Sequence, residues 1–340
     1  MNSFSVSVII PVKNRARDLL IVLGSLAQQS IGHECIVVDQ GSTDGTLEVA
    51  GRFGARVIHG KSRTVGGLRN EGILASNAPV VALIDSDHEV PSDWLQAGLR
   101  ALAENPEAGV VGAPYLAPAS ARWVAKAWEA HRRRNCFDGL QRVEWLSGGN
   151  LFFRREDFLA LGGFDSDLSA TEDVDLCHRF RASGLHVVLD PRILNTHHGE
   201  PDSLLQFFRK QVWRGADGWT AWRRHGYPLV ELKSLLFPLW VVVVGILVGL
   251  NLGGFWSIWG RGQNFFNPIF LRGLLVFVWV FPMLAQSSQV VISTKNVKLF
   301  FPLITLYIVF GIARFFSVLF AFRSLLGMPA QTTTDMNVDA

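Results

Sequence analysis

The stretch Pro79-Val80-Val81-Ala82-Leu83-Ile84-Asp85-Ser86-Asp87 decides the fold class of this chain. Its first six residues are wholly apolar, which is typical of a strand buried on both faces of a parallel sheet. Two carboxylates then stand one residue apart where the chain leaves the sheet. Open α/β sheets bind ligands at the carboxyl ends of their strands, and Asp85 and Asp87 could hold a divalent cation whose open positions bind phosphates. The alternative is an acidic turn without a metal.

Strand-like and helix-like segments alternate on both sides of this stretch. Helical periodicity covers residues 16–28 and 64–76, and a helix is expected to start near Asp44 because that turn is rich in glycine and capping residues. The strand-like segments lie at residues 6–10, 35–38, 55–58, 80–84, 110–111 and 186–189. This alternation predicts βαβ units and an α/β domain with a mostly parallel central sheet over residues 1–200.

Three long apolar runs follow, at residues 235–260, 273–294 and 299–322. The first two have no charged residue, and the third has only Arg314. A helix needs about 20 apolar residues to cross a bilayer, so these are three candidate transmembrane helices within residues 233–325. In the third run, Arg314 could instead end a short span and begin an interfacial helix. Residues 326–340 are expected to form a flexible tail.

Two segments interleave basic and aromatic residues, at 122–134 and 203–224. Such helices suit a lipid interface, and residues 201–232 are therefore expected to form an amphipathic interfacial segment. A helix packed on the catalytic domain with a charged, solvated side is the alternative.

Bulk composition narrows the class of protein. Apolar residues make up 49% of the 340 residues, and the net charge is only +3, which predicts no nucleic-acid partner. The N-terminus shows no signal peptide, so the catalytic part is expected in the cytoplasm of a multi-pass protein of the inner cell membrane. Lys295 and Lys298 fit a cytoplasmic loop. The three cysteines show no metal-binding spacing, which indicates a reducing compartment.

Further motifs occur in a fixed order along residues 6–198. They are Ser7-Val8-Ile9-Ile10-Pro11 with Asn14, Val37-Val38-Asp39 with Gly41-Ser42-Thr43-Asp44-Gly45-Thr46, Arg69-Asn70-Glu71-Gly72, Asp85-Ser86-Asp87, Gly148-Gly149-Asn150 with Arg154, and Thr171-Glu172-Asp173-Val174-Asp175-Leu176. In these motifs the chain resembles the family 2 glycosyltransferases, which have the GT-A fold and use nucleotide-sugar donors. The resemblance implies a GT-A-type nucleotide-sugar-binding domain.

The resemblance also implies a catalytic base. Asp173 matches the general base that removes a proton from the acceptor hydroxyl during attack. Glu172 is expected to orient the acceptor or to cap the helix that follows. One base opposite the leaving group implies direct displacement, with inversion at the anomeric carbon. Residues 171–173 could also serve simply as N-terminal helix residues favoured by the helix dipole.

A metal site is implied by the same family. Asp87 matches the direct ligand of Mg²⁺ or Mn²⁺. Asp85, of the same acidic pair, is expected to contact the ribose or sugar of the donor. His197 or His198 is expected to complete the metal shell. The cation would neutralise charge on the departing diphosphate. A structural histidine is the alternative reading of His197.

The donor is expected to contact the ends of the first strands and the glycine motif. Besides Asp85, the residues implied in nucleotide or donor binding are Pro11, Asn14, Asp39, Gln40, Arg69, Gly148, Gly149 and Asn150. Gln40 stands where the family commonly has a second acid that accepts a hydrogen bond from uracil. A glutamine both donates and accepts, so a UDP-sugar is favoured while another base stays open.

The expected function is transfer of a sugar from a nucleotide-sugar to a lipid-linked or cell-envelope glycan at the membrane. Gln211-Val212-Trp213-Arg214 is similar to a motif of processive members, but Gly215 replaces the final tryptophan. We therefore expect addition of a single sugar. The alternatives are transfer to polyprenyl phosphate and an inactive GT-A module in a membrane complex.

Overall fold

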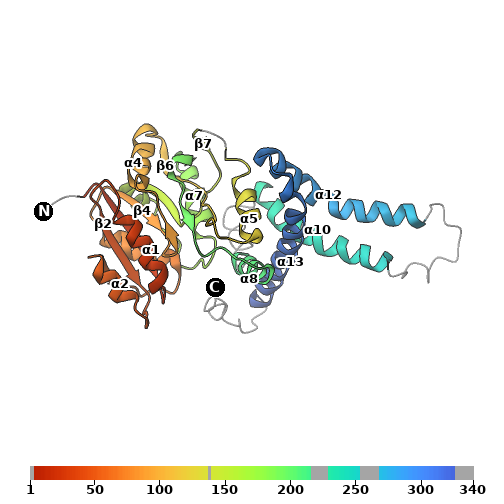
Figure 1. Ribbon diagram of the computed structural model, residues 1–340, viewed down its shortest axis with the longest axis horizontal. Coiled ribbons are helices and arrows are strands. Elements are labelled where there is room, and N and C mark those ends of the chain that lie inside the picture. Colours follow the sequence, from red (N-terminus) through yellow and green to blue (C-terminus); the bar gives the residue numbers. More distant parts are fainter. Residues whose placement is uncertain (1–3, 137–138, 216–228, 253–267, 326–340) are drawn as a thin grey trace. The chain divides into compact units, whose positions relative to one another are not determined.

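The computed structural model describes residues 4–136, 139–215, 229–252 and 268–325 (Figure 1). Contacts divide the chain into two units, residues 1–120 with 135–200 and residues 121–134 with 201–340. The division differs from the expected one at residues 121–134, which belong to the second unit. The expected tail (326–340) and part of the expected interfacial segment (216–228) lie outside the described residues.

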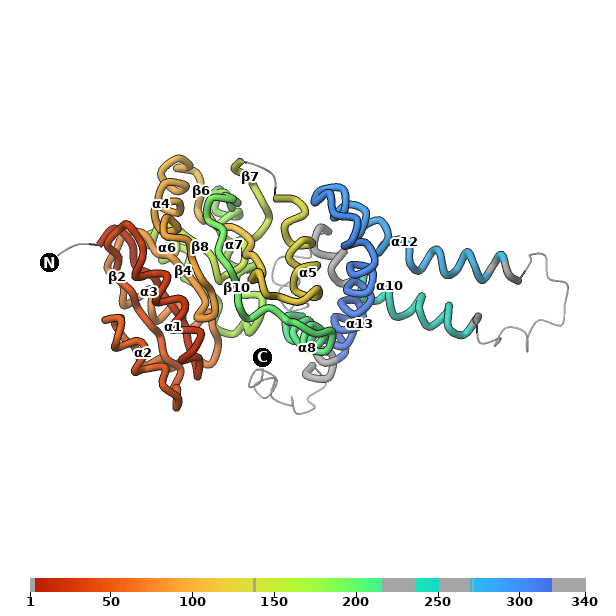
Figure 2. The backbone as a smooth tube through the Cα atoms, in the orientation of Figure 1, coloured from red at the N-terminus to blue at the C-terminus, as the bar shows by residue number. Residues whose placement is uncertain are grey.

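The first unit is an α/β structure, and its chain path is shown in Figure 2. Its elements are β1 (Val6–Val12), α1 (Ala16–Leu26), β2 (Glu34–Asp39), α2 (Thr46–Arg52), β3 (Arg56–His59), α3 (Val65–Ala75), β4 (Val80–Ile84), β5 (His88–Glu89), α4 (Trp94–Glu104), β6 (Ala108–Gly112), β7 (Gln141–Arg142), β8 (Asn150–Arg154), α6 (Arg155–Ala160), α7 (Glu172–Ala182), β9 (His186–Leu189) and β10 (Thr196–His197).

The eight-stranded sheet has the order β3-β2-β1-β4-β8-β6-β9-β7. Strands β3, β2, β1 and β4 are mutually parallel, and β6 is parallel to β9. Strand β8 runs antiparallel to both β4 and β6, and β7 runs antiparallel to β9. The mostly parallel sheet predicted from the sequence is confirmed.

Two hydrophobic cores cover the two faces of this sheet because alternate strand residues point in opposite directions. In β1, Val8 and Ile10 join one core, together with side chains of α1, α2 and α4. Ile9 joins the other, together with side chains of α3, α6 and α7. The central strands are therefore held between helical layers.

Side-chain hydrogen bonds mark the turns in which α2 and α3 start. Asp44 accepts a hydrogen bond from the Thr46 backbone N–H at 2.9 Å, as expected for a helix beginning in this turn. Thr64 caps α3 by accepting from the Gly67 N–H at 3.2 Å. Asn14 has a positive φ of 51° and accepts from the Thr43 N–H at 2.7 Å, which ties the end of β1 to the loop after β2.

The second unit is helical and has a core of its own. Its helices are α5 (Trp123–Arg133), α8 (Leu204–Arg214), α10 (Leu229–Leu252), α12 (Pro268–Thr294) and α13 (Phe300–Leu325). Trp128 of α5 lies against Phe207 of α8 and Phe310 of α13, at ring-centroid distances of 4.8 and 5.6 Å. This packing explains why α5 belongs to the helical unit although it interrupts the α/β unit in sequence.

Two candidate membrane-spanning segments are found among the described residues. Two described segments, Arg272–Thr294 and Val297–Leu319, are long and apolar enough to cross a membrane, with mean hydropathies of 1.7 and 2.0. In the first run, the described apolar helix is the shorter Leu236–Leu250. Residues 253–260 of that run lie outside the part that the structure describes. Membrane association is compatible with these helices.

Candidate active site

The candidate site lies at the carboxyl ends of the parallel strands in the first unit. Asp39 ends β2, Asp85 follows β4, and register pairs Ile84 of β4 with Asn150 of the antiparallel β8. The reversed direction of β8 brings its beginning, and with it Gly148 and Gly149, to the edge where β4 ends. Sheet topology thus joins motifs that are more than 60 residues apart in the sequence.

Arg69 links the acidic motif after β4 to the one at the start of α7. Its Nη2 donates to Asp85 Oδ1 and its Nη1 donates to Glu172 Oε1, both at 2.7 Å. The arginine is 3% exposed, and its Cζ lies 5.6 Å from the centre of the Phe164 ring. The sequence placed Arg69 beside the base and ribose of the donor. The structure places its guanidinium between two carboxylates of the site, and its contact with the donor stays a prediction.

The pKa values of these carboxylates move in opposite directions. Desolvation raises the pKa of Asp85, but the charge and hydrogen bond of Arg69 together with the effect of His88 outweigh it, so the net pKa is lowered. Burial, helped by the Asp173 charge and opposed by Arg69, raises the pKa of Glu172 from 4.5 to about 7. Asp85 therefore stays ionised near neutrality, whereas Glu172 is partly protonated there.

This shift predicts a pH dependence of stability. The native state binds the Glu172 proton more tightly than the unfolded chain does, so the stabilisation is complete below pH 4.5 and is lost as pH rises to about 7. Between these values we expect the free energy of unfolding of the parent to fall more steeply than that of Glu172→Gln, which cannot titrate. Denaturant unfolding at several pH values measures both slopes, and equal slopes would contradict the assignment.

Asp173 is held at the first turn of α7 by backbone donors. The Gly148 N–H donates to Asp173 Oδ2 at 3.0 Å, and the Val174 N–H donates to Oδ1 at 2.8 Å. These bonds fix the orientation of the carboxylate that is predicted to be the general base. The expected helix from residue 174 begins slightly earlier, at Glu172.

The two glycines of residues 148–149 are required by close approach to side chains of the site. A Cβ on Gly148 would lie 2.5 Å from Arg69 Nη1, and a Cβ on Gly149 would lie 2.5 Å from Asp85 Oδ2. The sequence explained these glycines by approach to a sugar or phosphate, whereas the structure shows protein side chains in that space. Any larger residue would displace Arg69 or Asp85.

Asp87, His88 and His197 form the one metal-type group found among the described residues, with their ligand atoms within 4.8 Å of one another. His197 Nε2 lies 3.2 Å from Asp87 Oδ2, and His88 Nε2 lies 3.8 Å from Asp87 Oδ1. Asp85 is outside the group because its carboxylate pairs with Arg69. His198 is also outside, since it faces Glu89 at 2.9 Å.

The chemistry of this group fits a divalent cation. One carboxylate and two imidazoles are common donors to divalent transition metals. Burial, and after it the neighbouring His197, lower the pKa of His88 to about 4. The ring is therefore neutral, as a metal ligand must be. A Cβ on Gly199 would overlap Asp87 Oδ2, so this glycine makes room for the carboxylate. His88 was missed by sequence reasoning, although it directly follows Asp87.

Glu200 orients His197 from behind. Its Oε1 lies 2.6 Å from His197 Nδ1, and both side chains are almost completely buried. The carboxylate accepts the Nδ1 proton and leaves the Nε2 lone pair directed toward Asp87. We expect Glu200→Gln to weaken Mn²⁺ binding about 10- to 100-fold, measured by calorimetry on the purified chain. The matched control is Glu89→Gln, which removes the partner of His198 and should leave Mn²⁺ affinity unchanged.

Four of the expected nucleotide-binding residues lie at or just after the ends of β1 and β2. Pro11, Asn14 and Gln40 lie at the strand ends, where Gln40 Nε2 donates to the Ser62 carbonyl at 2.9 Å. Asp39 is 1% exposed and accepts from the Gly41 and Ser42 N–H groups at 3.0 and 3.1 Å, which gives it a role in shaping its own loop.

Asn150 differs from the expectation of donor binding. Its side chain is fully buried, accepts from Trp94 Nε1 at 3.0 Å, and donates to the carbonyls of Ala113 and Ile193 at 2.9 and 2.8 Å. All three bonds join different segments of the domain. Asn150 is therefore a structural residue, and the glycines before it are the part of the motif that lines the site.

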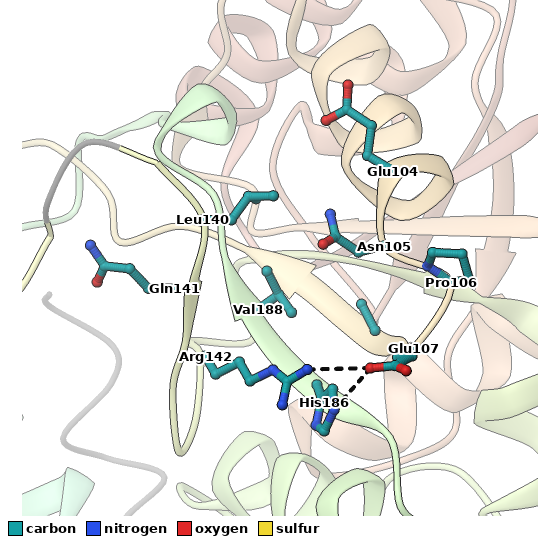
Figure 3. Close-up of a pocket in the computed structure, with 10 residues that line it drawn as sticks. Glu104, Asn105, Pro106, Glu107, Leu140, Gln141, Arg142, His186 and Val188 are labelled. Carbon is teal, nitrogen blue, oxygen red and sulfur yellow. Dashed lines mark hydrogen bonds and ion pairs between the residues drawn. The ribbon is translucent and has the colours of Figure 1, made fainter.

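A separate pocket of about 450 Å³ lies at the beginnings of β6 and β9 (Figure 3). Arg142 and His186 both face Glu107 there, at 3.2 and 3.3 Å. Because β6 and β9 run from this pocket toward Gly112 and Leu189, it lies at the opposite edge of the sheet from the acidic motifs. It shares no residue with the candidate site.

Comparison with known proteins identifies the class. Residues 7–161 match the model of glycosyl transferase family 2. The chain is 24% identical over 247 residues to glycosyltransferase AglE of Haloferax volcanii, a match that covers 70% of this chain and 80% of that protein. It is 28% identical over 205 residues to a pre-mycofactocin glycosyltransferase of Mycobacterium tuberculosis, covering 56% and 42%.

Among solved structures, the mannosyltransferase PcManGT from Pyrobaculum calidifontis, in complex with GDP-Man and Mn²⁺, has a TM-score of 0.62 to this chain at 16% identity. The match covers 95% of this chain and 88% of that one. The first unit thus has a GT-A-like α/β fold. Residues 7–161 of this unit match the family 2 glycosyltransferase domain, and the enzyme is a glycosyltransferase.

Proposed function

We propose that this glycosyltransferase is metal-dependent and inverting, and that it transfers a sugar from a nucleotide-sugar to a lipid-linked or cell-envelope glycan at the cytoplasmic face of a membrane. The supporting observation is the continuous network from Asp85 through Arg69 to Glu172. It places the motif expected to bind the donor and the motif expected to supply the base in one site. A donor and an acceptor would have to meet in such a site.

Asp87, His197 and His88 are the residues that would hold the cation. Bound there, Mg²⁺ or Mn²⁺ supplies Lewis-acid stabilisation of the diphosphate leaving group. The neighbour PcManGT was solved with Mn²⁺ and GDP-Man, which supports a divalent metal and a nucleotide-sugar for this chain as well.

Asp173 acts as the general base. An acceptor hydroxyl has a pKa far above neutrality, so a carboxylate must take its proton as the oxygen attacks. The Gly148 N–H and the Val174 N–H each bind one oxygen of this carboxylate, which holds it in a fixed orientation. A single base without a second nucleophile implies direct displacement and inversion.

Arg69 and Glu172 position the reacting groups. Arg69 holds Asp85 and Glu172 at a fixed separation, and its charge keeps Asp85 ionised for contact with the donor. Glu172 in turn lies directly before the base. Loss of this link would separate the donor motif from the base while leaving each in place locally.

A UDP-sugar is the favoured donor. Gln40 Nε2 is bound to the Ser62 carbonyl, so the amide presents its oxygen as an acceptor, which matches the N–H of uracil. Guanine also has a ring N–H, so GDP-sugars are the second choice. Polyprenyl phosphate is the second acceptor choice, because it would lie at the same membrane surface.

A donor screen tests the proposal. The purified full chain is incubated with UDP- and GDP-sugars and a membrane lipid extract, with Mn²⁺ or with excess chelator, and nucleotide release is followed. We expect release from one donor class only in the presence of metal. Equal release in chelator would contradict the role of Asp87 and His197, and no release from any donor would contradict the proposed donor class.

A further inference from the structure

Helix α13 is apolar enough to cross a membrane, but most of its side chains are buried or partly buried by protein. Of the nineteen positions from 301 to 319, only four are exposed. In α10, eight of the fifteen positions from 236 to 250 are exposed. The apolar composition of α13 is therefore explained by packing within the second unit, whereas that of α10 is not.

The exposed apolar surface is concentrated on α10 and the first half of α12, which pair with each other (Figure 1). Trp279 Nε1 donates to the Val241 carbonyl at 2.9 Å across this pair. Pro282 interrupts α12 between the exposed Phe281 and the fully buried Met283. The exposed side chains are Leu236, Leu239, Trp240, Val243, Ile246, Leu247, Leu250, Phe270, Leu274, Val276, Phe277 and Phe281.

Two amphipathic helices, α5 and α8, pack against the middle of α13. His131 Nδ1 of α5 lies 2.7 Å from the Tyr307 hydroxyl. Ser317 donates to the Val212 carbonyl of α8 at 2.8 Å, and a Cβ on Gly215 would overlap Ser317. From Tyr307 to Ser317 the helix rises about 15 Å, so α5 and α8 together cover half of a bilayer thickness on α13.

These two helices are strongly cationic. Residues 121–134 and 201–215 contain eight lysines and arginines and two carboxylates, Glu129 and Asp202. Three of the arginines, at 132–134, directly follow the His131 that contacts α13, and Arg314 lies on α13 itself. If α13 crossed the bilayer, α5 and α8 would carry these charges into the hydrocarbon region, where cations are strongly disfavoured.

We propose that α13 does not cross the membrane and that α5, α8 and α13 form a layer lying along its surface, where the net positive charge of α5 and α8 attracts anionic lipid headgroups. Only the pair of α10 and the first half of α12 enters the bilayer. Amphipathic basic helices bind this interface through apolar burial and attraction to lipid phosphates. Both ends of a two-helix hairpin return to one side of the membrane, so this arrangement predicts that the chain before α10 and the chain after α12 are on the same side.

Cysteine labelling of the full chain tests this arrangement. In a background in which the native Cys35, Cys136 and Cys177 are replaced by serine, single cysteines are introduced at Asp167→Cys in the first unit, Ser257→Cys between α10 and α12, and Thr332→Cys after α13. Intact and permeabilised cells are then treated with a membrane-impermeant reagent. We expect Thr332→Cys to behave like Asp167→Cys and Ser257→Cys to behave oppositely. Thr332→Cys behaving like Ser257→Cys would show that α13 crosses. Identical behaviour of all three would show that the hairpin does not.

Nitroxide depth measurements give an independent readout that uses no donor, so they can fail without bearing on the proposed glycosyl transfer. Labels at the exposed positions Thr305→Cys and Phe316→Cys of α13 are compared with a label at Ile246→Cys of α10, in reconstituted bilayers. We expect both α13 labels near the headgroups and the α10 label deeper. Positions 305 and 316 are about 16 Å apart along the helix, so a crossing α13 would place at least one of them deep.

Discussion

Asp173→Asn is expected to lower the turnover number by about 1,000-fold while donor affinity stays unchanged. The asparagine keeps the size of the side chain and an acceptor oxygen for one of the two backbone donors, but it cannot accept the proton of the attacking hydroxyl. The Gly148 N–H at 3.0 Å can still bind the amide oxygen, so the local fold should persist. Nucleotide release at saturating donor measures turnover, and calorimetry measures donor affinity.

The matched control for this substitution is Asp167→Asn. Asp167 is exposed and lies in the turn before the same helix, so the same chemical change there should leave turnover at the parental level. If Asp173→Asn turned over donor as fast as the parent, Asp173 would not be the base. A large loss in both variants would indicate a general effect of the substitutions on this region.

Arg69→Leu is expected to destabilise the first unit by about 3–5 kcal/mol, because it leaves a buried carboxylate without its partner. Glu172 is the carboxylate at stake: its side chain is 7% exposed, whereas that of Asp85 is 36% exposed and can be hydrated. Hydrogen exchange of peptides from α3 and α7 in the detergent-solubilised full chain measures the loss locally.

A double variant separates the charge from the packing of Arg69. In Arg69→Leu/Glu172→Gln the buried position is neutral, so we expect part of the lost protection in α3 and α7 to return. Equal exchange in the single and double variants would mean that the Arg69–Glu172 ion pair is not the source of the effect. Turnover should stay low in both, because Asp85 has lost its partner as well.

The fold of the first unit followed from local signals. The buried run at residues 80–84 became β4 at the same residues, and the capping residues around Asp44 and Thr64 start α2 and α3 where the spacing indicated. These features depend on neighbouring residues alone. The antiparallel insertion of β8 between β4 and β6 did not, since strand order depends on packing between distant segments.

In the site, too, contacts between distant segments could not be predicted from the sequence. The motifs that contain Asp85, Asp87 and Asp173 could be picked out in the sequence, but the partners of their side chains could not. Arg69 and Glu172 are 103 residues apart and meet only because α3 and α7 pack on one face of the sheet. For the same reason Asn150 was assigned to the donor, although its amide binds three separate segments in the interior.

The helical unit shows why composition alone misleads. All three apolar runs were candidates for crossing a membrane, with an interfacial helix as the alternative at Arg314, yet a larger share of α10 than of α13 is exposed. A buried core helix and a lipid-facing helix have similar composition. The basic segment at 122–134 could likewise be recognised as amphipathic, but not that it packs with α8 and α13 in a separate core.

The anomeric configuration of the product tests the proposed chemistry most directly. The full chain is supplied with an α-configured nucleotide-sugar, and the linkage configuration of its product is assigned by proton NMR from the coupling constant of the anomeric proton. One-step displacement with Asp173 as base predicts a β-linked product. An α-linked product would contradict it, because retention requires chemistry other than a single attack assisted by one base.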